Sequence, residues 1–453
     1  MNQWLLFKKA AAALILCAAT AWAGPRPTFT VLTTFPIGVF PLDPPIEGTD
    51  GNFYGITVVN PAPATIYKVT PQGALTTIYT FCSQLICTDG SQPEAGLVLG
   101  SDGNFYGTTL RGGANDFGAV FRITPAGMLT TLHSFDQTDG AGPCSPLIQA
   151  NSGDFYGTTG SAGGTIFKIT PAGALTTLYK FPEPPSTGSC APPLQAANGN
   201  FYGTNADDGQ GSGSIYELTP AGAFTTVHSF TGSDGANPTD GLVQTADGNF
   251  YGTTVEGGAY GSGTVFQLAP DGTLITLYSF GSPQSPDGAF PYAPLVYASN
   301  GKFYGTTSAG GGWGGFGTVF QISSQGALNR LYSFRARDGQ PVTGLMQGTD
   351  GAFYGVAVSG IVGGGILYKL SGGAPPFIKT VPLSGPPAST VTVLGTNLTG
   401  TTSVTFNGVA AAFTVASATE ITTTVPAGAT TGKVQVTTHN STLSNVGQFI
   451  VTP

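Results

Sequence analysis

One short pattern recurs seven times along the chain and limits what it can fold into. The motif Asn-Phe-Tyr-Gly, or a close variant, places a tyrosine at Tyr54, Tyr106, Tyr156, Tyr202, Tyr251, Tyr304 and Tyr354, with spacings of 52, 50, 46, 49, 53 and 50 residues. A near-constant period of this length is typical of solenoids and propellers, in which each repeat is one supersecondary unit. The core must therefore be buried between neighbouring repeats.

A well-preserved copy, residues 241–280, shows what one repeat contains. Four short β-like runs are separated by turn signals, with Asp-Gly at 247–248 after the first run and Pro-Asp-Gly at 270–272 before the last. Asp-Gly favours a tight turn whose positive φ matches strand twist, while Pro fixes one φ and Gly accepts the left-handed conformation. Four antiparallel strands per repeat are the blade of a propeller.

The two ends of the array complement each other. Residues 28–35 match the fourth strand of a repeat but have no preceding partner strands, whereas the seventh copy, residues 344–371, lacks its fourth strand. Pairing of these ends would remove the two exposed sheet edges that an open array leaves. We therefore predict an all-β fold, a seven-bladed β-propeller closed by the N-terminal strand, with an open solenoid stack as the alternative.

Four segments of the repeat carry a family resemblance: Asn-Phe-Tyr-Gly-Thr-Thr, Gly-Gly, Val-Phe-x-Ile-Thr and Leu-Thr-Thr-Leu-Tyr-Ser-Phe. Over residues 28–371 the array resembles the GloVer tandem repeat, named for Gloeobacter and Verrucomicrobia. The resemblance implies an exported bacterial protein that often carries a C-terminal sorting or accessory segment. It implies no established activity and no catalytic residues.

The period disappears after the linker at 372–376, and short Thr- and Val-rich alternating runs follow. These runs, with the turn Asn407-Gly408, favour a small β-sandwich. Residues 375–453 resemble an IPT/TIG domain, an Ig-like module, in the stretches GTNL, SVTFNGV and VPAGATTGKVQV. The resemblance implies an extracellular interaction or spacer role. The predicted units are a signal peptide (1–23), the propeller (24–372) and the Ig-like domain (373–453).

The N-terminus has the pattern of a secretory signal peptide. Lys8 and Lys9 precede an apolar run at 10–20, and Ala-Trp-Ala at 21–23 provides a small-x-small cleavage site before Gly24. The apolar run is well short of the roughly 20 residues that span a bilayer, so we expect no transmembrane anchor. A lipoprotein at Cys17 is a weaker alternative because bulky Leu16 precedes it. We expect a secreted, extracellular or periplasmic protein.

The charge and the cysteine content limit the possible partners and the cellular compartment. Charged residues make up 8% of the chain, with 15 Lys+Arg against 23 Asp+Glu, which argues against a nucleic-acid partner. The four cysteines outside the leader suit an oxidising compartment. Cys82 and Cys87 can close a small loop, and Cys144 and Cys190 occupy matching stretches of neighbouring repeats. Four unpaired thiols are the alternative. We expect a monomer.

The loops of one propeller face carry the candidate binding residues. In a four-stranded antiparallel blade, the loops after the second and fourth strands emerge together, and here they bear the inserts. Aromatic rings beside polar groups suit stacking on sugar rings or other flat apolar faces, and solvated loop residues are the alternative interpretation. The candidates are Arg111, Asp116, Asp207, Asp208, Glu256, Tyr260, Trp313 and Phe316.

No metal, cofactor or catalytic residue is predicted. The recurring acids Asp89, Asp139, Asp234, Asp287 and Asp338 are each followed by Gly and lack the dense alternation of a calcium loop, so turn capping is the expected role. His133 and His228 replace a tyrosine of the fourth strand and are interpreted as packing substitutions. The chain contains no nucleophile elbow, zinc-protease helix or P-loop motif.

These observations favour a secreted or cell-surface binding or scaffolding protein that recognises a carbohydrate or a protein through one propeller face. The alternative is an extracellular propeller enzyme, a polysaccharide lyase or hydrolase with acids near the central channel. A structural envelope component is a third possibility.

Overall fold

The computed structural model describes residues 27–59, 63–161, 163–182, 190–206, 211–282, 286–312, 314–358 and 363–453. The predicted signal peptide, residues 1–23, lies outside these ranges. No helix long and apolar enough to cross a membrane occurs in the part of the chain that is described.

Each repeat forms one antiparallel sheet. The strands are β2 (Val39–Pro41), β3 (Ile46–Glu47), β4 (Phe53–Val59), β5 (Thr65–Val69) and β6 (Leu75–Thr80) in repeat 1; β7 (Val98–Leu99), β8 (Phe105–Thr109), β9 (Ala119–Ile123) and β10 (Leu129–Ser134) in repeat 2; β11 (Ile148–Gln149), β12 (Phe155–Thr159), β13 (Thr165–Ile169) and β14 (Leu175–Lys180) in repeat 3; and β15 (Leu194–Gln195), β16 (Phe201–Asn205), β17 (Ser214–Leu218) and β18 (Phe224–Ser229) in repeat 4. Repeat 5 has β19 (Val243–Gln244), β20 (Phe250–Thr254), β21 (Thr264–Leu268) and β22 (Leu274–Ser279); repeat 6 has β23 (Val296–Tyr297), β24 (Phe303–Thr307), β25 (Thr318–Ile322) and β26 (Leu328–Ser333); and repeat 7 has β27 (Gln340–Gln347), β28 (Phe353–Val358) and β29 (Gly365–Ser371).

The N-terminal strand belongs to the sheet of the last repeat. β1 (Thr28–Thr34) pairs antiparallel with β29, which gives the order β1-β29-β28-β27. Phe29 on β1 stacks on Tyr332 of repeat 6 and on Tyr368 of β29, with ring centroids 4.1 and 5.1 Å apart. The strand is therefore fixed by backbone pairing and by aromatic packing against the neighbouring sheet.

The repeated Phe-Tyr pair joins each sheet to the next. The tyrosine ring of one repeat packs on the phenylalanine ring of the following repeat, with centroids 4.0 to 4.3 Å apart, in the pairs Tyr54–Phe105, Tyr106–Phe155, Tyr156–Phe201, Tyr202–Phe250, Tyr251–Phe303, Tyr304–Phe353 and Tyr354–Phe53. The last pair joins repeat 7 to repeat 1. Because successive strand residues point to opposite faces, adjacent Phe and Tyr serve the two neighbours of each sheet.

Polar side chains reinforce these contacts. In repeats 3, 4, 5 and 7 the glutamine at the end of the first strand accepts a hydrogen bond from a backbone N–H of the preceding repeat, as in Gln149 from Ser101 at 2.9 Å. Between repeats 7 and 1 the acceptor is a carboxylate: Glu47 accepts from the Thr349 N–H at 3.0 Å and from its hydroxyl at 2.7 Å. The inner ends of the sheets are thereby linked.

The C-terminal residues form two sheets around a separate core. One sheet has the order β30 (Lys379–Val381), β32 (Thr390–Leu394), β36 (Glu420–Thr424), β35 (Phe413–Val415), and the other has β34 (Val409–Ala411), β33 (Thr401–Phe406), β37 (Val434–Thr438), β38 (Thr442–Ser444). β31 (Ser384–Gly385) pairs in parallel with β39 (Ile450–Val451). Val391, Ile421, Phe406 and Val436 contribute to the shared core from both sheets.

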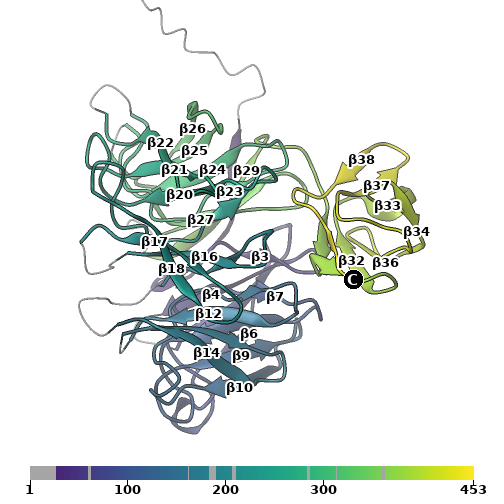
Figure 1. Ribbon diagram of the computed structural model, residues 1–453, viewed down its shortest axis with the longest axis horizontal. Coiled ribbons are helices and arrows are strands. Elements are labelled where there is room, and N and C mark those ends of the chain that lie inside the picture. Colours follow the sequence, from purple (N-terminus) through teal and green to yellow (C-terminus); the bar gives the residue numbers. More distant parts are fainter. Residues whose placement is uncertain are drawn as a thin grey trace, which may run out of the picture.

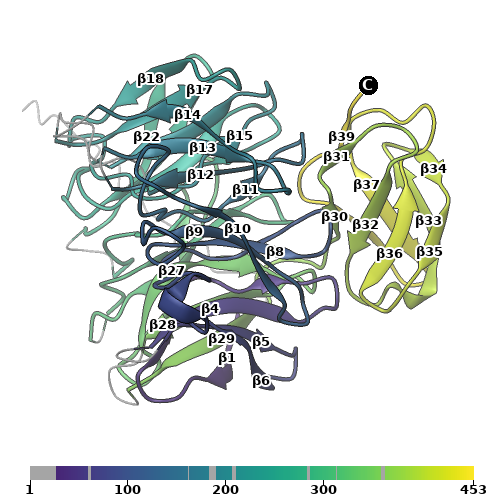
Figure 2. The same cartoon turned by 90° about the horizontal axis from the view of Figure 1, so that it is seen from below.

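This C-terminal unit lies beside the repeats, on the side of the tight turns between first and second strands (Figure 1, Figure 2). The Tyr304 hydroxyl donates to the Gly373 carbonyl at 2.5 Å, and the Ser384 hydroxyl donates to the Asn151 carbonyl at 3.3 Å. Lys379 of β30 pairs with buried Glu47 at 3.1 Å. The same carboxylate therefore joins repeat 7 to repeat 1 and holds the C-terminal unit.

Candidate functional site

The loops after the second and fourth strands meet on the side away from the C-terminal unit. Isolated backbone bridges join them in repeats 2, 5 and 6: Ser91 pairs with Arg111, Ala236 with Glu256, and Ala289 with Ala309. The loops therefore form one continuous surface, which we call the loop face. Glycines at left-handed positions allow the close approach, as at Gly257, where an added Cβ would lie 2.5 Å from the Gly232 carbonyl oxygen.

A cavity of about 600 Å³ opens on the loop face where repeats 5, 6 and 7 meet. Thr239 and Asp240 come from the segment before β19, and Phe290 and Tyr292 come from the segment before β23. Ser308 follows β24, and Gln340 begins β27. The Tyr292 side chain is 49% exposed. Aromatic walls with a few polar groups are the usual composition of a small-molecule site.

Phe290 is held in an unusual backbone conformation at this cavity. Its φ is 57°, a left-handed value that bulky side chains rarely adopt. The same left-handed position before proline is held by Gln92 in repeat 2, Gly142 in repeat 3 and Asn237 in repeat 5, so the backbone conformation belongs to the repeat and Phe290 places a bulky side chain in it. Three hydrogen bonds fix the residue: its N–H donates to Ser262, and the N–H and hydroxyl of Ser308 donate to its carbonyl. Such strain clusters at functional sites.

The carboxylate of Asp240 lines the cavity, and a second carboxylate, Asp43, acts on it electrostatically. Asp43, before β3 of repeat 1, and Asp240, before β19 of repeat 5, occupy equivalent positions of their repeats. Burial raises the pKa of Asp43 to about 6, although the Gly96 N–H opposes the shift. Burial, followed by repulsion from Asp43, raises the pKa of Asp240 well above its usual range. The protein surrounds both carboxylates, yet solvent reaches part of each residue.

Asp240 is fixed through its backbone rather than its carboxylate. The Thr204 hydroxyl of repeat 4 donates to its carbonyl at 2.8 Å, as the Thr253 hydroxyl does to Ala293 at 3.1 Å. The hydrogen bond that its carboxylate accepts comes from the adjacent Gly241 N–H. None of the described side chains that line the cavity is basic, so the negative charge there has no countercharge from the lining.

Two segments of the chain, residues 40–210 and 186–416, match the family model of the Gloeobacter/Verrucomicrobia repeat. Together they span most of the sequence. The chain belongs to this repeat family. No curated protein matches the sequence.

Several solved structures are similar to this repeat-family member at low identity. The extracellular domain of BT3049 from B. thetaiotaomicron, assigned to a hybrid two-component system, has a TM-score of 0.51 and 12% identity over 94% of this chain and 58% of that one. The WD40 β-propeller domain of Doa1 has a TM-score of 0.46 and 14% identity, covering 76% and 96%. The gluconolactonase XC5397 from Xanthomonas campestris has a TM-score of 0.40 and 13% identity, covering 77% and 94%.

The predicted loop residues of this repeat-family member do not gather in the cavity. Arg111 and Asp116 lie in repeat 2, where the Asp116 carboxylate accepts from the Gly112 N–H at 2.9 Å and shapes its own loop. Glu256 is exposed in repeat 5, and Tyr260 is 51% exposed nearby. Phe316 packs against the core shared by repeats 6 and 7. The remaining candidates, Asp207, Asp208 and Trp313, lie outside the described residues.

Asp240, Phe290 and Tyr292 were missed because they lie in the segments before the first strands rather than in the loops after the second strands, which carry the inserts. One signal was present: aligning the repeats places Asp43 and Asp240 where the other copies have Ala, Ser or Thr, whereas the position of Phe290 also holds Phe40, Gln92 and Gln340. A charged residue at a position that is otherwise small and uncharged breaks the local rule of the repeat. Such departures concentrate at functional sites.

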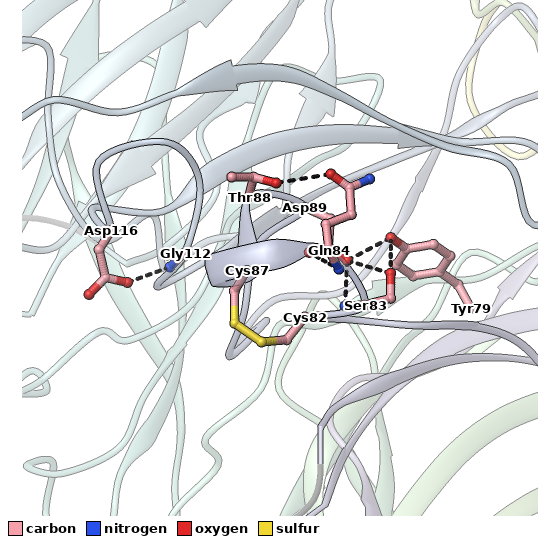
Figure 3. The surroundings of a disulfide bond; sticks show 9 residues. All are labelled: Tyr79, Cys82, Ser83, Gln84, Cys87, Thr88, Asp89, Gly112 and Asp116. Atoms are coloured by element: carbon pink, nitrogen blue, oxygen red, sulfur yellow. Dashed lines mark hydrogen bonds between the residues drawn. A yellow bond between two sulfur atoms is a disulfide. The ribbon is translucent and has the colours of Figure 1, made fainter.

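The recurring acids that follow the fourth strand cap their own loops. Asp89 accepts from the Tyr79 hydroxyl at 2.7 Å and from the Ser83 N–H at 3.0 Å, beside the Cys82–Cys87 disulfide (Figure 3). The short 3-10 helix η1 (Leu85–Cys87) in this loop presents Leu85 to solvent. Within the described ranges, no group of three or more His, Cys, Asp or Glu side chains is placed to hold a metal ion.

The histidines do more than fill the packing position of a tyrosine. His133 hydrogen-bonds Asp139 at 2.7 Å, and His228 hydrogen-bonds Asp234 at 3.0 Å. Each histidine thus replaces the tyrosine hydroxyl as the partner of the capping aspartate. The second disulfide joins Cys144 and Cys190, at equivalent positions of repeats 3 and 4.

Proposed function

We propose that this protein is a secreted or cell-surface binding or scaffolding protein that recognises a carbohydrate or protein ligand on the loop face. The cavity lined by Phe290, Tyr292 and Asp240 carries the proposal. Packing alone does not explain three features of the cavity: the left-handed backbone of Phe290, the exposed ring of Tyr292, and the Asp240 carboxylate, which has no side-chain partner among the described residues. All three are ordinary features of a ligand site.

The architecture that supports this role is a closed seven-bladed propeller followed by an Ig-like domain of the IPT/TIG type. Seven Tyr-on-Phe contacts, including Tyr354 on Phe53, support closure. β1 supports it further by completing the last blade. Because Lys379 and the linker dock the C-terminal unit on the opposite face, that unit serves as a spacer that leaves the loop face open to ligand.

An extracellular enzyme acting on polysaccharide is the second candidate, and the Asp43–Asp240 pair favours it. Carboxylates with raised pKa values beside a second acid are the usual acid and base of glycoside hydrolysis. In this interpretation Asp240, which lines the cavity, would be the proton donor, and Asp43 would keep its pKa high.

One set of measurements tests both candidates. The purified mature chain is applied to a glycan array and a panel of soluble polysaccharides, and each binding partner is assayed for released reducing ends. We expect binding that falls at least tenfold in Tyr292→Ala and remains in Tyr260→Ala, an exposed tyrosine of the same face outside the cavity. Binding that is equal in both variants would refute the cavity as the recognition site. Product release that disappears in Asp240→Asn would establish the enzyme instead.

A further inference from the structure

The chemistry of the cavity points to the charge of its ligand. Asp240 lines the cavity, and Asp43 is close enough to repel it. The described lining contains no basic side chain. Burial without a countercharge favours the neutral form of Asp240, and a bound cation would restore its ionised form.

The walls of the same cavity suit a charge that is carried on an apolar body. Phe290 and Tyr292 come from one segment, and the strained backbone of Phe290 fixes its position against Ser308. Aromatic faces attract ammonium groups through their quadrupole and stack on flat ligands. Thr239, Ser308 and Gln340 add hydroxyl and amide groups that can hydrogen-bond a polar substituent.

We propose that the loop-face cavity binds a protonated amine, with the ammonium group on the Asp240 carboxylate and the body of the ligand between Phe290 and Tyr292. The inference rests on the proposed binding function and names the ligand class of that site. The ammonium group can be an amine of a small molecule, an amino sugar or the lysine side chain of a protein partner. Asp43 contributes as a nearby charge, without contacting the ligand.

A neutral sugar and a bare divalent cation fit the site less well. A neutral ligand leaves the repulsion between Asp43 and Asp240 in place. Calcium takes six to eight oxygen ligands, usually from several carboxylates and carbonyls. The cavity lining described here offers a single carboxylate beside two aromatic rings.

The test uses benzylammonium as the probe and benzyl alcohol as its neutral isostere, in calorimetric titrations of the full mature chain at pH 7.5. We expect benzylammonium to bind at least tenfold more tightly than benzyl alcohol. Asp240→Asn should abolish this preference, and Asp43→Asn should reduce it severalfold by removing a more distant charge. The control is Asp271→Asn, which removes the same charge from an exposed turn between β21 and β22 on the opposite face.

Each outcome decides the proposal. A preference for the ammonium that is lost in Asp240→Asn and kept in Asp271→Asn supports it. Equal binding of the two probes, no binding of either, or a preference that survives Asp240→Asn overturns it. Calcium that binds by itself and excludes benzylammonium through both aspartates also overturns it, because the occupant is then a metal ion. The glycan and polysaccharide panel with Tyr292→Ala judges the proposed function separately, whichever way the amine titration ends.

Discussion

Replacing Asp43 by asparagine should stabilise the protein at neutral pH. Burial raises the pKa of Asp43 from 3.8 to about 6, so the native state binds the proton more tightly than the unfolded chain. The native state therefore carries no penalty below pH 4, and loses stability as the pH rises towards 6. A shift of this size corresponds to about 3 kcal/mol above pH 6. Asparagine removes the charge and still offers an oxygen to the Gly96 N–H.

The expected change can be read as a melting temperature. For a propeller of about 345 residues, at about 2.1 cal/mol/K per residue, a gain of about 3 kcal/mol raises the midpoint by about 4 °C. We expect this rise in scanning calorimetry at pH 7.5 and no difference from the native chain at pH 3.5. Comparing the two proteins at one pH cancels the titration of all other shared groups.

A matched variant should respond in the opposite sense. Hydrogen bonds, first from the Thr245 hydroxyl and then from Asn249, lower the pKa of the turn residue Asp247. Its charge therefore stabilises the native state at neutral pH, and this contribution is lost as the pH falls through the native pKa. Asp247→Asn should lower the midpoint at pH 7.5 slightly. If Asp43→Asn also lowers it, or raises it equally at both pH values, the view of Asp43 as a destabilising buried charge is wrong.

Three further perturbations address the architecture. Deleting residues 27–34 removes β1 and exposes the edge of β29. We expect calorimetry to show a loss of about 3 kcal/mol or more in the free energy of unfolding, and light scattering to show aggregation. An equally stable monomer would contradict ring closure. Replacing Cys144 and Cys190 together by serine opens a loop of 46 residues and, by the chain-entropy model, should lower the free energy of unfolding by about 4 kcal/mol. This loss is about twice that expected for the shorter Cys82–Cys87 bridge, and equal losses would contradict the model. Glu47→Gln should keep the contact to repeat 7 but lose the ion pair with Lys379. We expect docking of the C-terminal unit to weaken by about 1 kcal/mol and proteolysis of the linker to become faster. An unchanged cleavage rate would show that the ion pair does not hold the unit.

Much of the fold was predictable because the strand and turn signals of each repeat lie within that repeat. The turns at 247–248 and 270–272 and the runs between them correspond to β19–β22 in the structure. The unpaired segment at 28–35 could be matched to the incomplete last copy, and β1 pairs with β29. The burial of the core between repeats was predicted, but the rule that each tyrosine packs on the next repeat's phenylalanine was not. The neighbouring sheet that an aromatic ring contacts depends on how the sheets are arranged in space.

The candidate site followed from the sequence far less well. Long inserts drew attention to Glu256 and Tyr260, which are exposed on their own loops. Phe290 and Asp240 stand in the segments between the fourth strand of one repeat and the first strand of the next, where nothing in one repeat distinguishes a packing residue from a ligand contact. Their partners in the cavity come from different repeats, so no local pattern contains the site.

The sequence by itself determined the period, the four-strand repeat, the turn chemistry and the change of composition at the C-terminal unit, because hydrophobic alternation and Gly, Pro and Asp signals act over a few residues. Only the tertiary structure decided that Asp43 of repeat 1 and Asp240 of repeat 5 repel each other and that Glu47 joins repeat 7, repeat 1 and Lys379. Repeats that meet around a common centre bring their first strands together regardless of distance along the chain. Charge interactions depend on how far apart the charged groups lie in space, not on their separation along the chain.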